Sequence, residues 1–406
     1  MLAGRELVLG VTGSIAAYKA AYLVRELRRL GAGVTVVMTE HAMAFVAPLT
    51  FRTLSGRPVL SDLFDPHEPA AVEHVALAER ADLVLVAPAT ANALARAALG
   101  LADDFLGTLL LAARAPVLFA PAMDGEMWHH PAVQGHVAGL RARGATVMEP
   151  GRGELASGLS GVGRLPEIGD IVEAAARLVW PMRDFVGDQV VVTAGPTREP
   201  VDPVRYLSNR SSGRMGYAVA TQAARRGAQV TLVTGPTSLR PPPGIRVIPV
   251  QTAEEMREAV LRVLAGATVV IKAAAVADYR IAVPAPAKIR SKQAGLTLDL
   301  TPNPDILREI GRAKGARFLV GFAAETGDLR ARARAKLEAK GVDLMVANDV
   351  SRADIGFDVE ENQVVMLDRW GGVVELARRP KLEIADAILD RVQALRRAGA
   401  PAGASA

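Results

Sequence analysis

The residues best suited to chemistry lie between Gly195 and Ser212, in a loop that holds prolines, arginines and paired serines. Arg198, Arg205 and Arg210 offer forked donors for a phosphate or a carboxylate. The loop ends in Ser-Ser-Gly before a stretch with helical spacing, where free backbone N–H groups and the helix dipole favour an anion. The sequence therefore predicts an anion site in this loop. The alternative is a solvated surface loop capped by Ser212.

Lysine is rare in this chain and gathers in its second half. Only eight of the 48 basic residues are lysines, and five of them are Lys272, Lys288, Lys292, Lys336 and Lys340. A compact ammonium group suits phosphates as a point charge, so the clustering predicts polyanion binding, with chance as the alternative. Lys336 and Lys340 are four residues apart and fall on one face of a predicted helix.

A parallel sheet is needed to bring these residues together. Apolar residues at 190–193 and 229–233 predict strands, and helical spacing at 213–226 completes a strand–loop–helix–strand unit. Further strands are predicted at 267–275, 318–326, 344–349 and 364–367. Because parallel strands end at one edge of a sheet, Asp278 should lie level with the long loop, and Asn303 and Asp305 are expected near a helix start.

The first half of the chain predicts a second unit of the same architecture. Strands are expected at 6–11, 34–38, 81–87 and 116–120, with a helix from about 12 to 30. Small or hydroxyl residues follow several of these strands, as in Thr12-Gly13-Ser14 and Pro88-Ala89-Thr90-Ala91-Asn92. Ligands sit at such strand ends. A full GxGxxG is missing, so a dinucleotide fingerprint is not supported.

Three segments interrupt these two units. Residues 151–167 are dense in glycine without apolar periodicity, which predicts a mobile flap or clamp, with a floppy linker as the alternative. A linker is predicted at 181–188, between domains at 1–180 and 189–397, and a disordered tail at 398–406. The predicted fold class is α/β, with two Rossmann-like three-layer αβα domains and mainly parallel sheets.

Composition excludes several classes of protein. The chain has 406 residues, half of them apolar, and no cysteine, which removes disulfides, thiolate zinc sites and cysteine nucleophiles. The N-terminal apolar run is too short for a signal peptide and no stretch is long enough for a membrane span, so we expect a cytoplasmic protein. A net charge of +5 with few aromatic residues argues against nucleic acid and favours small anionic ligands.

Several motifs resemble a known pair of enzyme domains. The segments TAGPTREPVDPVRYLSNRSSGRMG, AAAVADYR, AKIRSK, TPNPDIL, GFAAET and VANDV resemble the phosphopantothenate–cysteine ligase domain. TGSIAAYK, VEHVALAERADLVLVAPATANALA, PAMDGEMW and LASGLSGVGRLPE resemble the phosphopantothenoylcysteine decarboxylase domain, which is flavodoxin-like. Both occur in this order in the bifunctional bacterial proteins of coenzyme A biosynthesis.

For the second half, the resemblance implies that CTP and Mg²⁺ activate phosphopantothenate as an acyl-cytidylate, which the amine of cysteine then attacks. Lys288 and Asn209 would be catalytic, and Arg205, Asn209, Arg210 and Ala275 would bind substrate. The implied nucleotide-binding residues are Lys272, Ala273, Ala274, Asp278, Lys288, Pro304, Asp305, Ile306, Leu307, Phe322, Lys336 and Lys340. Protein ligands for the metal stay unknown, since Mg²⁺ is expected to bind largely through the CTP phosphates.

For the first half, the resemblance implies an FMN-dependent decarboxylase that turns phosphopantothenoylcysteine into phosphopantetheine. His74, which alone would be read as a surface or cap residue, matches the catalytic histidine of the family. The implied cofactor-binding residues are Gly13, Ser14, Thr39, Pro88, Thr90, Asn92 and Met123. The resemblance also implies a homo-oligomer with trimeric flavin domains and dimeric ligase domains.

Two positions depart from the family pattern. Asp124 stands where the family often has asparagine, and Ser157 stands where the clamp often carries a cysteine as proton donor. A serine hydroxyl is a much weaker acid than a thiol, so we hypothesise that Asp124, or a water held by Ser157, transfers the proton. Whether Asp124 is protonated stays open. The alternatives are a working ligase with a structural flavin domain, and a regulatory module without catalysis.

Overall fold

The fold is described from a computed structural model of the chain. It describes residues 2–63, 73–155, 158, 160–180, 182–290, 296–325, 327–349 and 360–399. The chain divides into two compact units, Met1–Pro181 and Met182–Ala406, each of which is described by itself. Among the described residues, no helix combines the length and the apolar character that crossing a membrane requires.

The first unit is built on a sheet of parallel strands in the order β3-β2-β1-β4-β5-β6. The strands in that order are β3 (Val59–Leu60), β2 (Gly33–Met38), β1 (Glu6–Val11), β4 (Leu83–Ala89), β5 (Val117–Pro121) and β6 (Thr146–Val147). The central strands are buried on both faces, which is why they are continuous apolar runs such as LVLVAPA in β4. The register places Leu7 of β1 beside Leu83 of β4.

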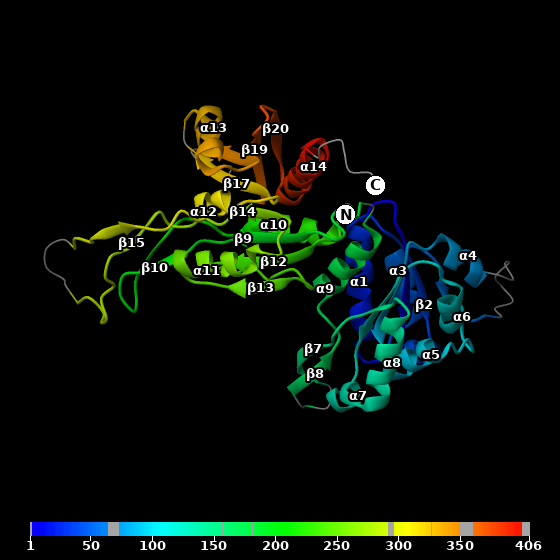
Figure 1. Cartoon of the computed structure of the whole chain (residues 1–406). Helices are drawn as coiled ribbons and strands as arrows, with labels where there is room; N and C mark the ends of the chain where they lie inside the picture. The colour runs from blue at the N-terminus through cyan, green and yellow to red at the C-terminus, as the bar shows by residue number, and fades with distance from the viewer. Residues whose placement is uncertain are drawn as a thin grey trace. The chain divides into compact units, whose positions relative to one another are not determined.

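Helices cover both faces of this sheet and make two cores (Figure 1). One face carries α1 (Ala17–Arg29), α3 (Pro48–Ser55) and α9 (Ile168–Val179). The other carries α4 (Glu73–Arg80), α5 (Ala91–Leu99), α6 (Phe105–Ala112) and α8 (Pro131–Ala142). Two short helices, α2 (Glu40–Met43) and α7 (Gly125–His129), follow β2 and β5. The flap segment contains an antiparallel hairpin, β7 (Gly151–Glu154) and β8 (Ser160–Arg164).

The second unit has a larger sheet in the order β13-β12-β9-β14-β17-β18-β19-β20. Its strands are β13 (Arg246–Pro249), β12 (Gln229–Thr234), β9 (Gln189–Ala194), β14 (Val269–Lys272), β17 (Phe318–Glu325), β18 (Leu344–Asp349), β19 (Glu361–Asp368) and β20 (Val373–Pro380). The strands from β13 to β18 run parallel, whereas β19 and β20 are antiparallel additions. The predicted fold class, two Rossmann-like three-layer αβα domains with mainly parallel sheets, is confirmed.

Helices again lie on both faces of the second sheet. α10 (Arg214–Arg225) and α14 (Lys381–Gly399) share one core, and α11 (Ala253–Leu264), α12 (Ile306–Arg312) and α13 (Leu329–Lys340) share the other. The contact between α10 and β9 requires a glycine: a Cβ on Gly216 would lie 2.6 Å from the Cβ of Ala194. This close approach fixes the N-terminus of α10 against the end of β9.

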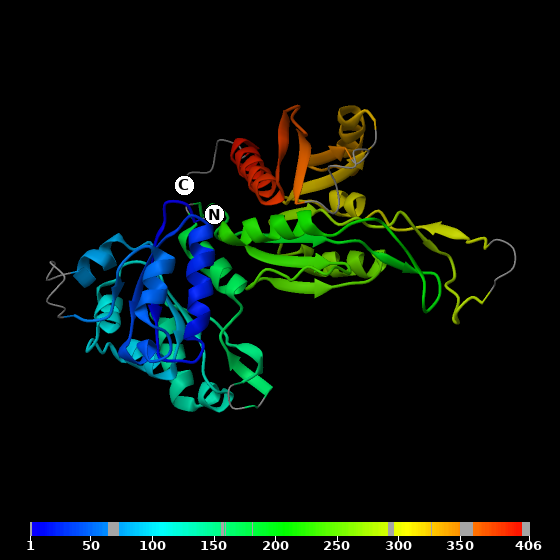
Figure 2. The same cartoon turned by 180° about the vertical axis from the view of Figure 1, so that it is seen from behind.

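Two short antiparallel pairs form an arm on the second unit, which the sequence did not predict. They are β10 (Arg198–Pro200) with β11 (Tyr206–Ser208), and β15 (Tyr279–Ile281) with β16 (Leu300–Pro302). We call these strands with residues 201–205 and 282–290 the arm. In both views β10 and β15 run outward from the sheet beside each other (Figures 1 and 2). The predicted loop 195–212 is therefore partly a hairpin.

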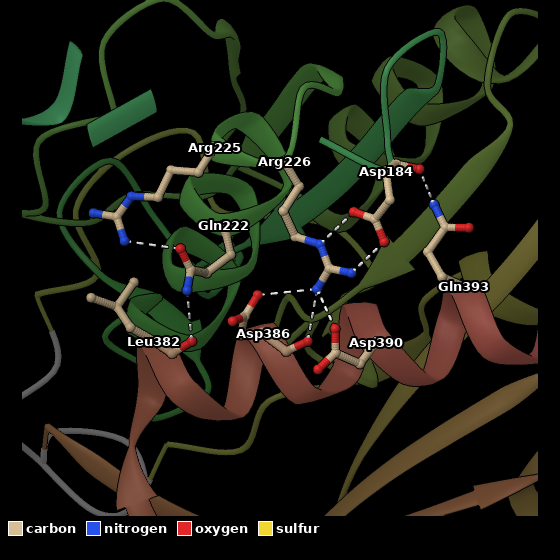
Figure 3. Close-up of polar contacts among 8 residues, drawn as sticks. All are labelled: Asp184, Gln222, Arg225, Arg226, Leu382, Asp386, Asp390 and Gln393. Carbon is tan, nitrogen blue, oxygen red and sulfur yellow. Dashed lines mark hydrogen bonds and ion pairs between the residues drawn. The ribbon is translucent and has the colours of Figure 1, made fainter. Parts of the chain in front are cut away.

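From Asp184 onward, the segment predicted as linker 181–188 packs into the second unit. Phe185 is fully buried in the second unit, and the guanidinium of Arg226 pairs with Asp184 at 2.7 Å (Figure 3). Arg226 also binds Asp386 and Asp390 of α14, so this arginine joins the segment before β9 to two helices. Pro181 lies outside the described residues. At the other end α14 runs to Gly399, so residues 398 and 399 of the predicted tail are helical and 400–406 lie outside the described part.

Candidate active sites

The second unit holds a cavity of about 630 Å³ at the carboxyl ends of β9, β14, β17 and β18. Parallel strands bring their following loops to this edge, as the sequence predicted. The predicted site residues that line it are Asn209, Arg210, Lys272, Ala273, Ala274, Ala275, Asp278, Pro304, Asp305, Ile306, Leu307, Phe322, Lys336 and Lys340. Residues separated by more than a hundred positions thus share one cavity.

The long loop after β9 reaches this cavity through its last residues. Asn209 donates its side-chain amide to the carbonyl oxygen of Val276 at 2.9 Å, which ties the loop after β9 to the loop after β14. The hydroxyl of Ser211 accepts the N–H of Gly213 at 3.3 Å, and Gly213 precedes α10 with a φ of +78°. The Ser-Ser-Gly segment therefore lines the cavity at a helix start, where backbone N–H groups can meet an anion.

The loop after β14 is held by threonines of the neighbouring segment. Thr193 accepts the N–H of Ala274 at 3.2 Å, and Thr197 accepts the N–H of Ala277 at 3.0 Å. The bond from Ala274 to a side chain interrupts the backbone ladder, so β14 ends at Lys272 although a strand was predicted over 267–275. An isolated bridge still pairs Ala275 with Pro196, and the alanine-rich loop lines the cavity.

Lys272 is the most perturbed cation of this cavity. Its half-buried ammonium group has its pKa lowered to about 8, first by burial and then by repulsion from Lys340 and Lys336, while Asp305 and Asp278 act in the opposite direction. Opposite and like charges shift a pKa in these directions. A perturbed lysine in a cavity is typical of a site that meets an anionic ligand.

Two further lysines of the cavity, Lys336 and Lys340, are paired with carboxylates. Lys340 binds Asp305, which also caps α12 by accepting the N–H of Arg308 at 3.2 Å. Burial raises the pKa of Asp305, but the hydrogen bonds from Lys340 and from the N–H of Arg308, together with the charges of both residues, outweigh this and lower the pKa overall. Lys336 lies 2.6 Å from Glu325. The pairs keep the charges in place at the cavity wall.

Two predicted site residues do not line this cavity. Arg205 pairs with Asp202 at 2.6 Å and donates to the carbonyl oxygen of Ile289 at 2.6 Å, so its guanidinium serves the arm. The prediction that Arg205 binds substrate is not supported by this placement. Lys288 is exposed on the arm, beside Ile289. Both roles were implied by motif alone, and the sequence did not predict the arm, in which Arg205 lies between β10 and β11 and Lys288 lies between β15 and β16. The clustered Lys292 lies outside the described residues.

The cavity has further lining residues that the sequence analysis did not single out. Arg214, Asn348, Asn362 and Lys381 are among them. Asn348 had a signal, because it ends a predicted strand and parallel strand ends carry ligand-binding residues. Lys381 is one of the eight lysines. Asn362 had no signal, since only the antiparallel pairing of β19 with β18 brings it to this edge.

The first unit has a cavity of about 1210 Å³ at the carboxyl ends of β1, β2, β4 and β5. Ligand pockets usually measure about 300–1,000 Å³, so this one has room for a cofactor and a substrate. Six predicted site residues line it together with Asp124: Gly13, Ser14, Thr39, Thr90, Asn92 and Met123. Its apolar wall includes Phe105, Leu106 and Phe119.

Hydroxyl side chains organise the loops around this cavity. Thr12 donates to the carbonyl oxygen of Pro88 at 2.7 Å and accepts the N–H of Thr90 at 3.1 Å. Pro88 therefore acts through its carbonyl and does not line the cavity itself. Thr90 caps α5, and Thr39 caps α2. The loop after β1 passes so close to α2 that a Cβ on Gly13 would lie 2.4 Å from the Cβ of His41.

The clamp and Asp124 meet at the same cavity. Asp124 caps α7 by accepting the N–H of Glu126 at 3.1 Å. Met123 donates its N–H to the carbonyl oxygen of Gly163 in β8 at 2.9 Å, which fastens the hairpin to the loop after β5. Glu154 and Arg164 of the hairpin line the cavity. Ser157 lies outside the described residues.

His74 packs against a residue of the cavity wall and does not itself line the cavity. It is half-buried on α4, and its ring meets the ring of Phe105 edge to face with 6.3 Å between centroids. Phe105 lines the cavity, whereas His74 does not. Further polar lining residues escaped the sequence analysis, namely Tyr18, Lys19, His41 and Arg164. Lys19 had a signal, as one of the eight lysines, and it lies in the TGSIAAYK motif.

Two known families match this chain. Residues 1–179 match the family described as "Flavoprotein", and residues 185–395 match the "DNA/pantothenate metabolism flavoprotein C-terminal domain". The two matches together cover nearly all of the described residues.

Curated proteins match over almost their whole length. The chain is 46% identical to the coenzyme A biosynthesis bifunctional protein CoaBC of Bacillus subtilis, covering 97% of this chain and 98% of that protein. It is 47% identical to the protein of the same name from Mycobacterium bovis, covering 96% of each. Among solved structures, the C-terminal domain of a CoaBC protein is 39% identical, covers 52% of this chain and 97% of that one, and gives a TM-score of 0.46.

Proposed function

The chain belongs to the CoaBC family of bifunctional coenzyme A biosynthesis proteins, which joins a decarboxylase domain to a ligase domain, and from this we propose two consecutive reactions. The ligase unit joins cysteine to phosphopantothenate at the expense of CTP. The flavin unit then decarboxylates the phosphopantothenoylcysteine to phosphopantetheine. The observation that carries the proposal is the lysine-rich cavity at the carboxyl edge of the second sheet.

In the first step, a carboxylate oxygen of phosphopantothenate attacks the α-phosphorus of CTP and pyrophosphate leaves. The amine of cysteine then attacks the acyl carbon, and CMP leaves with the oxygen that bridged the two. Both steps develop negative charge on phosphate oxygens, which fixed cations stabilise without reorganisation. We assign the triphosphate to Lys272, Lys336 and Lys340 and to the backbone N–H groups before α10.

Asn209 holds the activated acyl group. Its place between the loops after β9 and β14 supports this, because an acyl group bound at Ala275 would lie between these two loops. Arg210 completes the acid-binding side of the cavity, and Asp278, Phe322 and residues 304–307 surround the nucleotide.

Mg²⁺ enters with the nucleotide. Within the described ranges, no group of three or more histidine, aspartate or glutamate side chains could hold a metal ion. Mg²⁺ commonly keeps several waters and binds one or two carboxylates plus substrate phosphates. We therefore propose that the CTP phosphates provide most of its ligands.

Lys288 is supplied by a second copy of the chain. It is exposed on the arm and does not line the cavity of its own unit. A ligase dimer in which the arm of one chain reaches the cavity of the other would bring it to the reacting carboxylate. Mixing chains that carry Lys288→Ala with chains that carry Asn209→Ala tests this: a shared site restores roughly a quarter of the wild-type rate. No recovery would mean that each chain uses its own lysine.

The first cavity fits FMN. Close approach of backbone at Gly13, the hydroxyl group of Ser14, and the helix starts capped by Thr39 and Thr90 at the strand ends suit a phosphate. The apolar wall around Phe105 and Met123 suits a flat ring. When bound, FMN would accept the electrons released by oxidation of the cysteinyl thiol and return them after carbon dioxide has left.

The chain's own residues handle the protons of this reaction. We assign removal of the thiol proton to His74, whose ring packs against Phe105 of the cavity wall. Asp124, which lines the cavity, supplies the proton that completes the reduced product, or a water held by Ser157 does so. An acid near the reacting carbon contributes typically 10²–10⁴-fold to such a step.

A second candidate function keeps the ligase and leaves the flavin unit structural or non-reducing. The observation in its favour is the sequence itself, which lacks cysteine and has Asp124 in place of asparagine. Separate assays of carbon dioxide and phosphopantetheine distinguish the two candidates. Carbon dioxide release without phosphopantetheine would support the non-reducing unit, and neither product would support a structural one.

The proposal is tested by incubating the protein with phosphopantothenate, cysteine, Mg²⁺ and either CTP or ATP. We expect pyrophosphate, CMP and phosphopantothenoylcysteine with CTP, and phosphopantetheine if the flavin unit is active. Pyrophosphate formation that does not depend on phosphopantothenate would contradict the ligase assignment. The purified protein should be yellow, with flavin absorbance. We also propose trimeric flavin units, which light scattering can measure, and a cytoplasmic location.

A further inference from the structure

A buried carboxylate, that of Asp202, connects the two segments of the arm, residues 201–205 and 282–290. Asp202 is 4% exposed, and its side chain is completely covered. One oxygen accepts the N–H groups of Val204 and Arg205, each at 2.8 Å. The other accepts the Nε–H of Arg205 at 2.9 Å and the N–H of Ile289 at 3.1 Å. Four donors thus converge on one carboxylate.

Arg205 makes a second contact between the same two segments. Arg205, which pairs with Asp202, also donates to the carbonyl oxygen of Ile289 at 2.6 Å. Both polar backbone groups of Ile289 are therefore held by a single ion pair. A third bond, from the N–H of Ala285 to the carbonyl oxygen of Val201 at 2.9 Å, runs parallel to these. The segment that carries Lys288 is fixed to the β10–β11 hairpin on both sides of the lysine.

The surroundings of Asp202 favour the ionised form of its carboxyl group. Burial raises the pKa of the Asp202 carboxyl, but hydrogen bonds from Val204, Ile289 and Arg205 outweigh this and hold the pKa well below its usual range. Charge-assisted hydrogen bonds are roughly twice as strong as neutral ones. Prolines at 284 and 286 further restrict the chain before Lys288.

We propose that Asp202, together with Arg205, is a positioning residue for Lys288: it holds the peptide next to the lysine so that the ammonium group is presented at a fixed place on the arm. The inference rests on the proposed function, because Lys288 acts there on the carboxylate being activated. It gives Arg205 a role that requires no contact with substrate. A displacement of a catalytic group by about 1 Å can cost about 10²-fold in rate.

The test compares two buried aspartates of the same unit. Asp368 also accepts two backbone N–H groups, from Trp370 and Gly372, and pairs with Arg391, but it does not line the cavity or contact the arm. The full-length protein carries Asp202→Ala, Asp202→Asn or, as the matched control, Asp368→Ala. Two readouts are measured: hydrogen exchange of the Ile289 amide, and the kinetics of pyrophosphate release.

We expect Asp202→Ala to speed exchange at Ile289 by about 10- to 100-fold, because charge-assisted hydrogen bonds are lost there. The kcat of pyrophosphate release should fall by about tenfold or more while the KM for CTP changes little. Asp202→Asn keeps an acceptor oxygen and should lie between. Asp368→Ala should change neither the hydrogen exchange of the Ile289 amide nor the kinetics of pyrophosphate release, even if it lowers the stability of the unit.

Unchanged exchange at Ile289 in an active Asp202→Ala protein would overturn the proposal, and so would faster exchange with an unchanged kcat. A wild-type protein that released no pyrophosphate from CTP would instead remove the proposed function on which the role of Lys288 depends. The two failures are therefore distinguishable.

Discussion

Asn209 donates its side-chain amide to the carbonyl oxygen of Val276, 2.9 Å away, beyond the carboxyl ends of two parallel strands. The bond joins the loop that follows β9 to the loop that follows β14. Asp278 lies two residues beyond this contact, and both side chains line the same cavity. A side chain fixed in this way can meet an acyl group without first losing conformational freedom.

Replacing Asn209 by aspartate should separate the two steps of ligation. Asn209→Asp removes the donor to Val276 and adds a negative charge that repels phosphate oxygens. We expect amide formation to fall by about 10²–10³-fold, as when a donor to a developing oxyanion is removed. Pyrophosphate release should fall less, so that the acyl-nucleotide accumulates and is detected by mass spectrometry.

Asn303 provides the comparison for that variant. Its side-chain amide donates to the carbonyl oxygen of Ala277 at 2.9 Å, which is an equivalent bond in the neighbouring loop. Asn303→Asp should slow both steps to the same degree, because it disturbs the cavity without acting on the acyl group. Accumulation of acyl-nucleotide in both variants would argue that the effect comes from loop geometry alone.

The affinity for a triphosphate should depend on pH through Lys272. Its pKa of about 8 means that the ammonium form dominates below that pH and is lost above it, so affinity should fall as the pH rises through about 8. A bound phosphate raises the pKa of a neighbouring lysine, so binding near this pH takes up protons. Calorimetry of CTP binding in buffers of different ionisation enthalpy measures this uptake. It should disappear in Lys272→Met, and uptake that persists there would point to another group.

Exchanging Asp124 for asparagine tests the proton transfer in the flavin unit. The new side chain would still cap α7, since asparagine is as good a cap as aspartate, so the fold should be kept. We expect Asp124→Asn to release carbon dioxide while the rate of phosphopantetheine formation falls by about 10²–10⁴-fold. Equal rates of both products in the variant would assign the proton to another donor.

Arg226 should be important for the stability of the second unit. Its buried guanidinium binds Asp184 at 2.7 Å, Asp386 at 3.0 Å and Asp390 at 2.7 Å (Figure 3). Arg226→Met removes the partner of three carboxylates that water reaches in part, so we expect a loss of about 1–3 kcal/mol of unfolding free energy.

The exposed pair of Arg330 and Glu375 is the control for that measurement. Arg330→Met should change the unfolding free energy by about 0–1 kcal/mol. Chemical denaturation followed by circular dichroism compares the two variants. Equal small losses in both would mean that Arg226 contributes specificity of packing and little stability.

Local patterns in the sequence predicted the parallel strands and the polar residues that follow them. β1 and β9 are mostly apolar because helices cover both faces of their sheets, and such runs can be recognised without a structure. The helical spacing at 213–226 likewise predicted α10. For the same reason the residues of both cavities that follow strands were largely anticipated.

These local patterns do not predict which segments far apart in the sequence pair with each other. The strands of the arm have three residues each, too short for a periodic signal, so the sequence did not predict that Arg205 and Lys288 lie on an arm. Asn362 reaches the cavity only through the antiparallel partner of β18. Asp184 looked like linker because its partners, Arg226 and Gln393, lie 42 and 209 positions away along the chain.

The central claim is that the cavity of the second unit activates a carboxylate by transferring a nucleotidyl group to it. Phosphopantothenate with isotopically labelled carboxylate oxygens tests this directly, with mass analysis of all products after a single turnover with CTP and cysteine. The account predicts one labelled oxygen in CMP and none in pyrophosphate. Label in inorganic phosphate or pyrophosphate, or CMP without label, would contradict it.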